Sequence, residues 1–576
     1  MIQLTKSIAQ RPVLTPDALL LPVHPVLQRV YAHRGISSLA ELVRTPDKLL
    51  PFQTLKGIDT AVELLLKALQ QQRKLVIVGD FDADGATSTA TLLSGFRMLG
   101  FLHVDFLVPN RFEYGYGLSP EIAQLAIAQG AELIVTVDNG ISAIEGVAAA
   151  KAAGLQVIVT DHHLAGAQLP NADAIVNPNQ PDCAFASKAL AGVGVAFYLL
   201  LALRAAMREQ GYFANQAEPN LATLLDLVAL GTVADVVPLD SNNRLLVHLG
   251  LQRIRSGKVR PGIQALIDIA KRQAHKLTAS DFGFALAPRL NAAGRLDDMS
   301  IGIGCLLAND LTKARQIAAE LDSLNLERRE IEQGMQTEAL AFLSRLSFDR
   351  KALPKALCLY QADWHQGVIG ILAGRVKELY HRPVIAFAQG DDNQLKGSAR
   401  SVHGVHIRDL LDEISTRWPG LILKFGGHAM AAGLTIVADK LPLFEQAFTE
   451  IAEKSIADEL LTSVIYSDGE LSASDLSMEL AEALQQAGPW GQAFPEPVFH
   501  GKFRLLQQRL LGEKHLKVVL QASDGKLLDA IWFNCDYKAW PNPNVQWVEL
   551  AYQLDINEFR DQQNLQLMVK HMVVAS

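Results

Sequence analysis

The stretch from Leu75 to Gly85, which reads Leu-Val-Ile-Val-Gly-Asp-Phe-Asp-Ala-Asp-Gly, constrains the fold more than any other part of the chain. Its beginning is apolar and mostly β-branched, which is typical of a buried strand. Carboxylates follow at alternate positions, Asp80, Asp82 and Asp84, and the residues after Gly85 predict a turn and the start of a helix. Because acids so close together repel one another, the pattern indicates a cation site.

A calcium-binding EF-hand loop is one explanation of this D-x-D-x-D-G pattern, but that loop needs a bidentate Glu at its twelfth position. Counting from Asp80, the twelfth residue is Thr91. In addition, a strand precedes these acids where an EF-hand has a helix. The sequence therefore excludes an EF-hand and favours a metal of another kind.

From this strand onward the chain alternates between strand-like and helix-like segments. Helical periodicity marks residues 60–72, 119–129 and 142–153. The strand-like runs are residues 75–79, 104–108, 133–137, 156–160 and 174–176. Strands separated by helices predict an α/β fold with a parallel, doubly wound sheet. In such sheets ligands bind beyond the carboxyl ends of the strands.

Acidic residues end several of these apolar runs. Asp138 ends Leu-Ile-Val-Thr-Val-Asp, the triplet Asp161-His162-His163 ends Val-Ile-Val-Thr, and Asp235 follows the apolar run 227–233. One such aspartate alone is usually only a turn or a helix cap. Since separate segments share this ending, we expect them to deliver carboxylate and imidazole ligands to one edge of the sheet.

His162 and His163 are adjacent, and adjacent residues of an extended chain point to opposite sides. We therefore expect one of them to bind a metal while the other faces a substrate. Without the aspartates nearby, two surface histidines in a loop would be the preferred interpretation.

Composition limits the class of protein. A chain of 576 residues predicts about four domains, or fewer large ones. The net charge of −8 argues against a general coat of basic residues that binds nucleic acid, although it allows a basic groove. The 4 cysteines form no C-x-x-C, and the N-terminus shows no signal peptide. The longest uncharged run, residues 189–203, is too short to span a bilayer, so we expect a cytoplasmic protein.

The second half of the chain changes character twice. Residues 251–276 are rich in Lys and Arg, which indicates either a solvated face or a wall of a DNA path. Residues 310–346 lack proline and carry apolar residues at helical spacing, which predicts a long connecting helix. Near the C-terminus, Leu550, Tyr552, Leu554 and Ile556 alternate with small or polar residues, as in a strand. Several such strands predict a small barrel.

Four motifs of the chain resemble those of the DHH phosphoesterase superfamily. They are Asp-Phe-Asp-Ala-Asp-Gly from Asp80, Asp138-Asn-Gly, Asp161-His-His, and Gly-Thr-Val-Ala-Asp-Val-Val-Pro around Asp235. Stretches around Val108, Pro288, Trp364 and Phe425 are similar to the RecJ family within it. The resemblance covers nearly the whole chain and implies a 5′→3′ exonuclease specific for single-stranded DNA.

The resemblance also implies a domain order. A packing segment, residues 1–55, would precede a DHH catalytic domain at 56–309. A connecting helix at 310–350 would lead to a smaller α/β domain, DHHA1, at 351–462. Residues 463–576 would form an OB-fold barrel that binds single strands.

Resemblance to the superfamily implies two divalent ions, Mn²⁺ or Mg²⁺, of the kind that carboxylates and imidazoles hold. Asp138 would bridge them, and Asp82, with Asp80 as a further ligand, would hold the first ion. Asp84, His162 and Asp235 would hold the second. Asp161 would orient a ligand, and His163 would face the scissile phosphate. Many DHH enzymes carry a His where this chain has Val78, so we expect weaker binding at the first site.

Recognition of the DNA end would lie elsewhere. By resemblance, Arg111, Ser398 and Arg400 would line a pocket for the terminal 5′-phosphate, which suits the fork of an arginine. Contacts to the DNA backbone would come from Arg289, Asn291 and Arg295. Gly426, Gly427 and His428 form a Gly-Gly-His signal that either approaches a phosphate or makes an ordinary tight turn.

The partners that the resemblance implies are single-stranded DNA, a single-strand-binding protein and a helicase of DNA repair and recombination. No membrane partner is expected, and the protein would be a monomer. Two alternatives stay open. One is a DHH hydrolase of pyrophosphate or small nucleotides, which the basic stretches and the barrel disfavour. The other is an inactive DNA-binding scaffold, which the full set of carboxylates disfavours.

Overall fold

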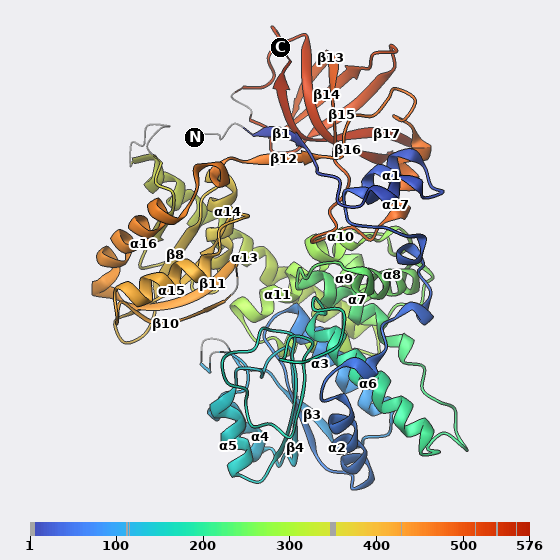
Figure 1. Ribbon diagram of the computed structural model, residues 1–576, viewed down its shortest axis with the longest axis vertical. Coiled ribbons are helices and arrows are strands. Elements are labelled where there is room, and N and C mark those ends of the chain that lie inside the picture. The colour runs from blue at the N-terminus through green and yellow to red at the C-terminus, as the bar shows by residue number, and fades with distance from the viewer. Residues whose placement is uncertain are drawn as a thin grey trace. The chain divides into compact units, whose positions relative to one another are not determined.

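The computed structural model describes residues 6–110, 113–114, 116–345, 353–427, 429–512, 514–536, 539–559 and 562–575. The chain divides into two compact units, each described by itself below (Figure 1). The metal-site unit consists of Val13–Asn325 and Glu482–Glu496, and the barrel unit consists of Met1–Pro12, Leu326–Ala481 and Pro497–Ser576. Among the helices of the described residues, none is long and apolar enough to cross a membrane.

A parallel sheet forms the centre of the metal-site unit. Its strands lie in the order β3-β2-β4-β5-β6, and every neighbouring pair is parallel. Their bounds are β2 Leu75–Val78, β3 Val104–Leu107, β4 Leu133–Val137, β5 Gln156–Thr160 and β6 Ala174–Val176. All of these strands coincide with strand-like runs of the sequence, so the doubly wound parallel sheet is confirmed.

Helices cover both faces of this sheet because its central strands are apolar on both sides. Along β2, Leu75 and Ile77 pack with α2, α3 and α6, whereas Val76 and Val78 pack with α4 and α5. These helices are α2 Ile58–Gln70, α3 Ala83–Met98, α4 Pro120–Ala128, α5 Ile144–Ala152 and α6 Gly192–Glu209.

Outside this sheet, the regular elements among the described residues of this unit are helices. The apolar run before Asp235 forms the helix α7 (Leu225–Ala234), so this acid follows a helix and not a strand of the sheet. Most of α7 is buried, and a short, continuous apolar run cannot be assigned to helix or strand by periodicity. The other helices are α1 Pro25–Ala32, α8 Ser241–Arg255, α9 Pro261–Ile269, α10 Ala279–Asp281, α11 Ala287–Leu296 and α12 Ser300–Leu307.

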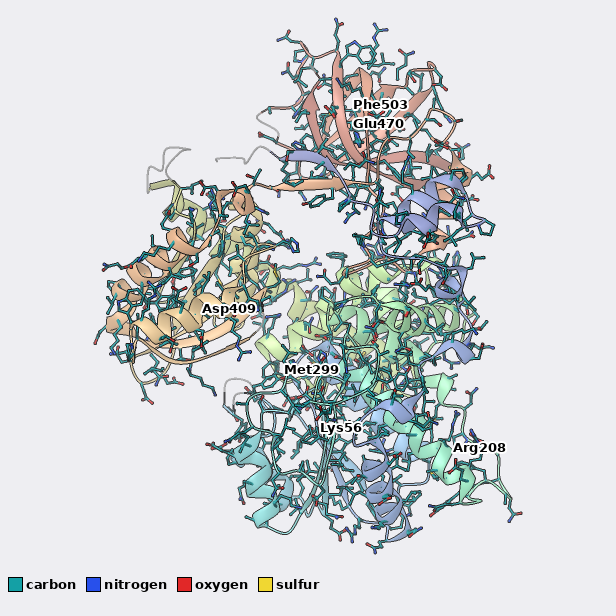
Figure 2. The ribbon with its side chains drawn as sticks, viewed as in Figure 1. Lys56, Arg208, Met299, Asp409, Glu470 and Phe503 are labelled. Carbon is teal, nitrogen blue, oxygen red and sulfur yellow. The ribbon has the colours of Figure 1, made fainter. Side chains whose placement is uncertain are left out.

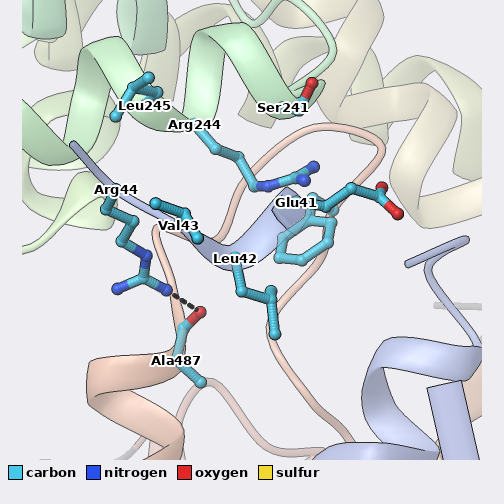
Figure 3. A pocket seen from close by; sticks show the side chains of 9 residues that line it. Glu41, Leu42, Val43, Arg44, Ser241, Arg244, Leu245 and Ala487 are labelled. Atoms are coloured by element: carbon cyan, nitrogen blue, oxygen red, sulfur yellow. Dashed lines mark hydrogen bonds between the residues drawn. The ribbon is translucent and has the colours of Figure 1, made fainter. Parts of the chain in front are cut away.

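Residues 482–496, which we name the return segment, come late in the chain but pack on the metal-site unit. Arg44 holds its start: Nη1 donates to the carbonyl of Gln486 at 2.8 Å. Nη2 donates to the carbonyl of Ala487 at 2.6 Å, which is the bond drawn in Figure 3. The guanidinium of Arg244 lies 4.3 Å from the centre of the Phe494 ring, which is a cation–π contact. An N-terminal segment and α8 thus fix the return segment.

The barrel unit contains a mixed sheet in the order β10-β11-β9-β8-β7. Its strands are β7 Leu357–Tyr360, β8 Val384–Gln389, β9 Gln394–Arg400, β10 Ile422–Gly427 and β11 Ala431–Val437. The helices around it are α14 Ile369–Tyr380, α15 Ile407–Arg417 and α16 Leu441–Ser455, and α17 Met478–Ala487 follows later. The predicted connecting helix is α13, Leu311–Arg345.

The loop before α14 is anchored to α13. Trp364 is buried, and its Nε1 donates to the carboxylate of Glu338 at 2.9 Å. Earlier on α13, Glu332 accepts from Nε of Arg375 at 3.0 Å. Two contacts therefore hold α14 and the loop before it against the connecting helix.

The last strands close into a barrel in the order β13-β14-β15-β17-β16, which agrees with the expected OB-fold. They are β13 Phe499–Leu511, β14 His515–Gln521, β15 Leu527–Trp532, β16 Trp547–Phe559 and β17 Gln562–Val574. Phe503, which is labelled in Figure 2, lies on β13. It packs edge-on against the buried Tyr552, with ring centres 5.6 Å apart. In the same unit, β1 (Ser7–Gln10) pairs in parallel with β12 (Val464–Ser467).

Candidate metal centre

The acidic loops meet at the point where the strand order of the parallel sheet reverses. The chain goes from β2 to β3 on one side and then returns to β4 on the other, so a crevice forms beyond β2 and β4. Asp80 follows β2 and Asp138 follows β4. Asn139 joins the two loops, because its amide donates to the carbonyls of Val78 at 3.0 Å and Val137 at 2.8 Å.

A first group of ligand atoms comes from Asp80, Asp82 and Asp138, whose carboxylate oxygens lie within 4.8 Å of one another. Asp82 also caps α3, since its Oδ1 accepts from the N–H groups of Asp84 at 2.9 Å and Gly85 at 3.0 Å. A Cβ on Gly85 would lie 2.4 Å from the carbonyl oxygen of Asp80. Only glycine therefore fits where the acidic loop enters the helix.

A second group comes from Asp84, His162 and Asp235, again with ligand atoms within 4.8 Å of one another. Nε2 of His162 lies 3.0 Å from Asp138 Oδ1 and 3.4 Å from Asp235 Oδ2. The two groups are thus adjacent, and Asp138 lies between them.

Backbone geometry fixes Asp138 in this position. Its φ of 60° is in the left-handed region, which aspartate tolerates better than most residues. A Cβ on Gly192 would lie 2.8 Å from Asp138 Oδ1, so this glycine lets α6 approach the carboxylate. The N–H of Gly192 donates to Asp84 Oδ2 at 2.7 Å, and that of Val193 donates to Asp84 Oδ1 at 3.0 Å. The N-terminus of α6 therefore holds Asp84.

Asp161 and His163 form a pair beside these groups. Nδ1 of His163 lies 2.7 Å from Asp161 Oδ1, and Asp161 Oδ2 accepts from the N–H of Ile141 at 2.9 Å. The rings of His162 and His163 lie with centres 4.5 Å apart, and both can point a nitrogen toward Asp138. The expectation that the two histidines point to opposite sides is wrong, because β5 ends at Thr160 and the chain bends at His163.

Burial and mutual repulsion raise the pKa values of several carboxyl groups in the metal centre. Burial and the charge of Asp235 raise the pKa of Asp84 to about 7, and burial and the charge of Asp82 raise the pKa of Asp235 to about 7. Burial and the neighbouring carboxylates also raise the pKa of Asp138 well above its ordinary value. Concentrated negative charge in a buried place is stabilised by cations.

The pKa values of the two histidines are shifted in opposite directions. Burial and the charge of His163 lower the pKa of His162, which favours the neutral imidazole that ligates metals. Burial alone would lower the pKa of His163, but the hydrogen bond and charge of Asp161 raise it to about 9. The contact with Asp161 therefore favours the protonated form of His163.

Unsatisfied atoms test whether these residues fit metal ions. Asp138 Oδ1, His162 Nε2 and Asp235 Oδ2 are buried, and none forms a hydrogen bond within the described part of the chain. Buried polar atoms without partners are rare in folded proteins. Because these atoms converge from separate segments, divalent ions would satisfy all of them at once, and the donor set of carboxylates and imidazole suits Mn²⁺ and Mg²⁺.

Some residues of the centre lie outside the sequence motifs and were not predicted. Gly192 holds Asp84, as described above, and a Cβ on Gly231 would lie 3.0 Å from Asp84 Oδ1. The hydroxyl of Tyr116 donates to the carbonyl of Asp138 at 3.0 Å and lies 3.5 Å from Nε2 of His163. Glycines inside the otherwise large apolar sequences of α6 and α7 are the only signal that could have indicated the close packing.

The residues expected at the DNA end are distributed as follows. Ser398 and Arg400 lie on β9, and Arg400 Nη1 donates to Ser398 Oγ at 3.1 Å. Burial lowers the pKa of Arg400, and no carboxylate within the described residues opposes this shift. Gly426 and Gly427 end β10. The remaining two, Arg111 and His428, lie outside the described residues.

Residues expected to contact the DNA backbone lie on α11. Asn291 Oδ1 accepts from the N–H of Ala83 at 2.8 Å, which ties α11 to the acidic loop. Arg289 Nη2 lies 2.8 Å from Asp322 Oδ1, so its charge is already compensated within the protein. Arg295 lies in the last turn of the helix. In the basic stretch 251–276, Arg260 is likewise paired, with Asp226 at 3.0 Å.

A parallel sheet whose switch point gathers Asp80, Asp82, Asp84, Asp138, His162 and Asp235 defines a phosphoesterase of the DHH class. The family model described as "DHH family, N-terminal domain" matches residues 74–232, "DHHA1 domain" matches 353–454, and "RecJ OB domain" matches 467–571. The chain belongs to the RecJ family.

One relative is the "Single-stranded-DNA-specific exonuclease RecJ" of Dickeya dadantii, which is 58% identical over 95% of this chain and 96% of its own length. The crystal structure of RecJ from Thermus thermophilus in complex with Mn²⁺ has a TM-score of 0.80 and 29% identity, with 99% of this chain and 79% of that chain covered. The Mg²⁺ complex of the same protein has a TM-score of 0.75 and 28% identity, with 98% and 78% covered.

Proposed function

We propose that this protein is a metal-dependent exonuclease that hydrolyses single-stranded DNA from the 5′ end to 5′-mononucleotides, in DNA repair and recombination. The observation that carries the proposal is the pair of adjacent ligand groups, one of which contains Asp138, in a chain that matches a single-stranded-DNA-specific exonuclease over 95% of its length. Two divalent ions, Mn²⁺ or Mg²⁺, would be the cofactors, as the ions of similar RecJ structures indicate.

The ligands divide into two sets in this proposal. Asp80 and Asp82 would hold one ion, Asp84, His162 and Asp235 would hold the other, and Asp138 would serve as a ligand in both sites. When bound, two such ions neutralise the phosphodiester and lower the pKa of an attacking water. The N–H groups at the start of α6 keep the carboxylate of Asp84 oriented.

His163 acts on the substrate through its ring. Asp161 accepts the Nδ1–H, and the raised pKa of about 9 keeps a proton on Nε2 at neutral pH. That proton can be donated to a non-bridging oxygen of the scissile phosphate, where negative charge increases as water attacks. Tyr116 lies 3.5 Å from this nitrogen and restricts the ring.

The preference for a 5′ end would come from Arg400, Ser398 and Arg111. Arg400 is a cation with neutral hydrogen-bond partners, Ser398 Oγ and the carbonyl of Ala399 at 2.8 Å. A terminal phosphate would supply the missing negative charge. Backbone contacts farther along the strand would involve Asn291, Arg295 and the glycines at the end of β10.

The remaining parts follow the domain order expected from the sequence. Residues 56–309 would be the catalytic domain, 351–462 the end-recognition domain and 463–576 the barrel that binds single strands. The four cysteines are free, which suits a reducing compartment, and we propose the cytoplasm. A single-strand-binding protein and a repair helicase would be partners of a monomeric enzyme.

One experiment tests the proposal. Full-length protein is incubated with Mn²⁺ and 5′-labelled or 3′-labelled DNA, single-stranded or duplex, with a chelator as control. We expect label to leave the 5′ end of single strands as a mononucleotide, and no product with chelator. Asp138→Asn should abolish cleavage while the protein stays folded, because asparagine also tolerates a positive φ.

Other outcomes identify the alternatives. Faster hydrolysis of pyrophosphate or dinucleotides than of long strands would indicate a small-molecule DHH hydrolase. Tight binding of single strands without any metal-dependent product would indicate an inactive scaffold.

A further inference from the structure

A glycine of α14 lies directly against the two polar side chains of β9. Ser398 and Arg400 are two residues apart on a strand, so both face the same side of the mixed sheet. A Cβ on Gly370 would lie 2.8 Å from Arg400 Nη2 and 2.9 Å from Ser398 Oγ. Real Cβ atoms do not approach polar atoms so closely. Any other residue at 370 would therefore displace the arginine tip and the hydroxyl.

The positive charge of Arg400, beside Ser398 and Gly370, has no counter-ion among the described residues. Arg400 Nη1 donates to Ser398 Oγ and to the carbonyl of Ala399, which are both neutral acceptors. No carboxylate of the described residues forms an ion pair with Arg400. A partly buried guanidinium without a counter-ion is unfavourable unless an anion pairs with it. Since Ser398 Oγ accepts from Arg400, its own proton is available for an oxygen of that anion.

We infer that Gly370 is a specificity-determining residue: its missing side chain keeps the guanidinium of Arg400 and the hydroxyl of Ser398 in position for a terminal phosphate. This inference rests on the proposed function, since the phosphate is the 5′ end of the DNA. The neighbours of Gly370 are Arg400 and Ser398, which are not metal ligands, so it governs which end is accepted and not how the bond is cleaved.

Gly370→Ala is the test, because the atoms that must move are the ends of side chains and not backbone. The fold should survive while the pocket is rearranged. Gly374→Ala is the matched control: it lies on the same helix, and a Cβ there would meet nothing within 4 Å. Both full-length variants and the wild type are assayed with Mn²⁺ on one oligonucleotide that carries either a 5′-phosphate or a 5′-hydroxyl.

We expect the wild type and Gly374→Ala to share the same preference for the 5′-phosphate, as a ratio of kcat/KM. Gly370→Ala should lower that ratio at least tenfold, with kcat/KM on the 5′-hydroxyl substrate unchanged within about twofold. A ratio equal to that of the wild type, or equal losses on both substrates, would overturn the inference.

A second measurement needs no variant. Hydrogen exchange of residues 365–372 in the wild type is compared with thymidine 5′-monophosphate and with thymidine, both in the presence of chelator. Protection by the monophosphate alone supports the inference, and equal exchange with both ligands refutes it. If no DNA is hydrolysed at all, the proposed function fails, but this comparison still decides whether the cluster binds a terminal phosphate.

Discussion

Arg400 is the residue at which end selection can be separated from hydrolysis. Arg400→Ala removes the charge and the fork that would bind the terminal phosphate. Hydrogen bonds to charged groups contribute about 1.5–3 kcal/mol each, so kcat/KM on 5′-phosphorylated single strands should fall about 10- to 100-fold. The rate on a 5′-hydroxyl strand should change less than about threefold, because the metal centre is intact.

Arg417→Ala is the control for Arg400. Arg417 pairs with Glu413 on α15 in the same unit and is largely exposed. Its removal should leave both rates as in the wild type, since exposed ion pairs contribute little. If Arg400→Ala slows both substrates equally, this arginine has no role in end recognition.

The acids of the metal centre predict an unusual pH dependence of stability when metal is removed. The folded pKa values of Asp84 and Asp235, both about 7, lie above the unfolded value of about 4. Between these values the folded state binds more protons than the unfolded state, so stability falls as pH rises from about 4 to about 7. With chelator, Tm should therefore be lower at pH 8 than at pH 5. Mn²⁺ should raise Tm most at the higher pH.

Asp235→Asn provides the comparison for this experiment. It removes one of the two carboxyl groups whose pKa is raised. With chelator, its Tm should therefore depend less on pH and should be higher at pH 8 than that of the wild type. A Tm with chelator that rises from pH 5 to pH 8 would contradict the electrostatic account of the site.

Among the structural elements, the return segment offers the clearest stability test. Arg44 donates to two successive carbonyls at its start, and such bonds from a charged group contribute about 1.5–3 kcal/mol each. Arg44→Ala should make the amides of Gly491 and Phe494, which are hydrogen-bonded within this segment, exchange faster. Arg97→Ala, at an exposed position of α3, should leave their exchange unchanged.

Sequence reasoning was most successful for the elements and least successful for what happens beyond their ends. The parallel strands were predictable because continuous apolar runs of strand length alternate with helical periodicity. The apolar run before Asp235 could not be assigned to helix or strand from the sequence, because α7 is buried all round and has no polar face. His162 and His163 were separated by a rule that holds only for extended chain, and the turn after β5 was not visible.

Contacts between distant segments were also beyond sequence patterns. Gly192 lies about a hundred positions from Asp84, yet its N–H holds that carboxylate. The same holds for Gly370 and Arg400, which are brought together by the packing of α14 on β9. In both places a glycine is required by a neighbour that only the fold reveals.

For the whole molecule, the metal centre and the barrel belong to different units of the chain, so binding of long strands and hydrolysis should be separable. Phe533 and Trp547 are exposed aromatics of the barrel, at 46% and 50%, whereas Tyr552 is buried. Stacking of a base on an aromatic ring contributes about 1–3 kcal/mol. The double variant Phe533→Ala and Trp547→Ala should therefore bind a long single strand at least about tenfold more weakly and hydrolyse a dinucleotide at the wild-type rate.

Leu527→Ala is the control, because Leu527 is an apolar side chain of the barrel that is 61% exposed, and it should change neither the affinity nor the rate. Two measurements on the same preparations test this: single-strand affinity from fluorescence anisotropy, and the rate of dinucleotide hydrolysis. Equal losses of affinity and rate would mean that the two aromatics only support the fold. No loss in either would mean that DNA binds elsewhere on the barrel.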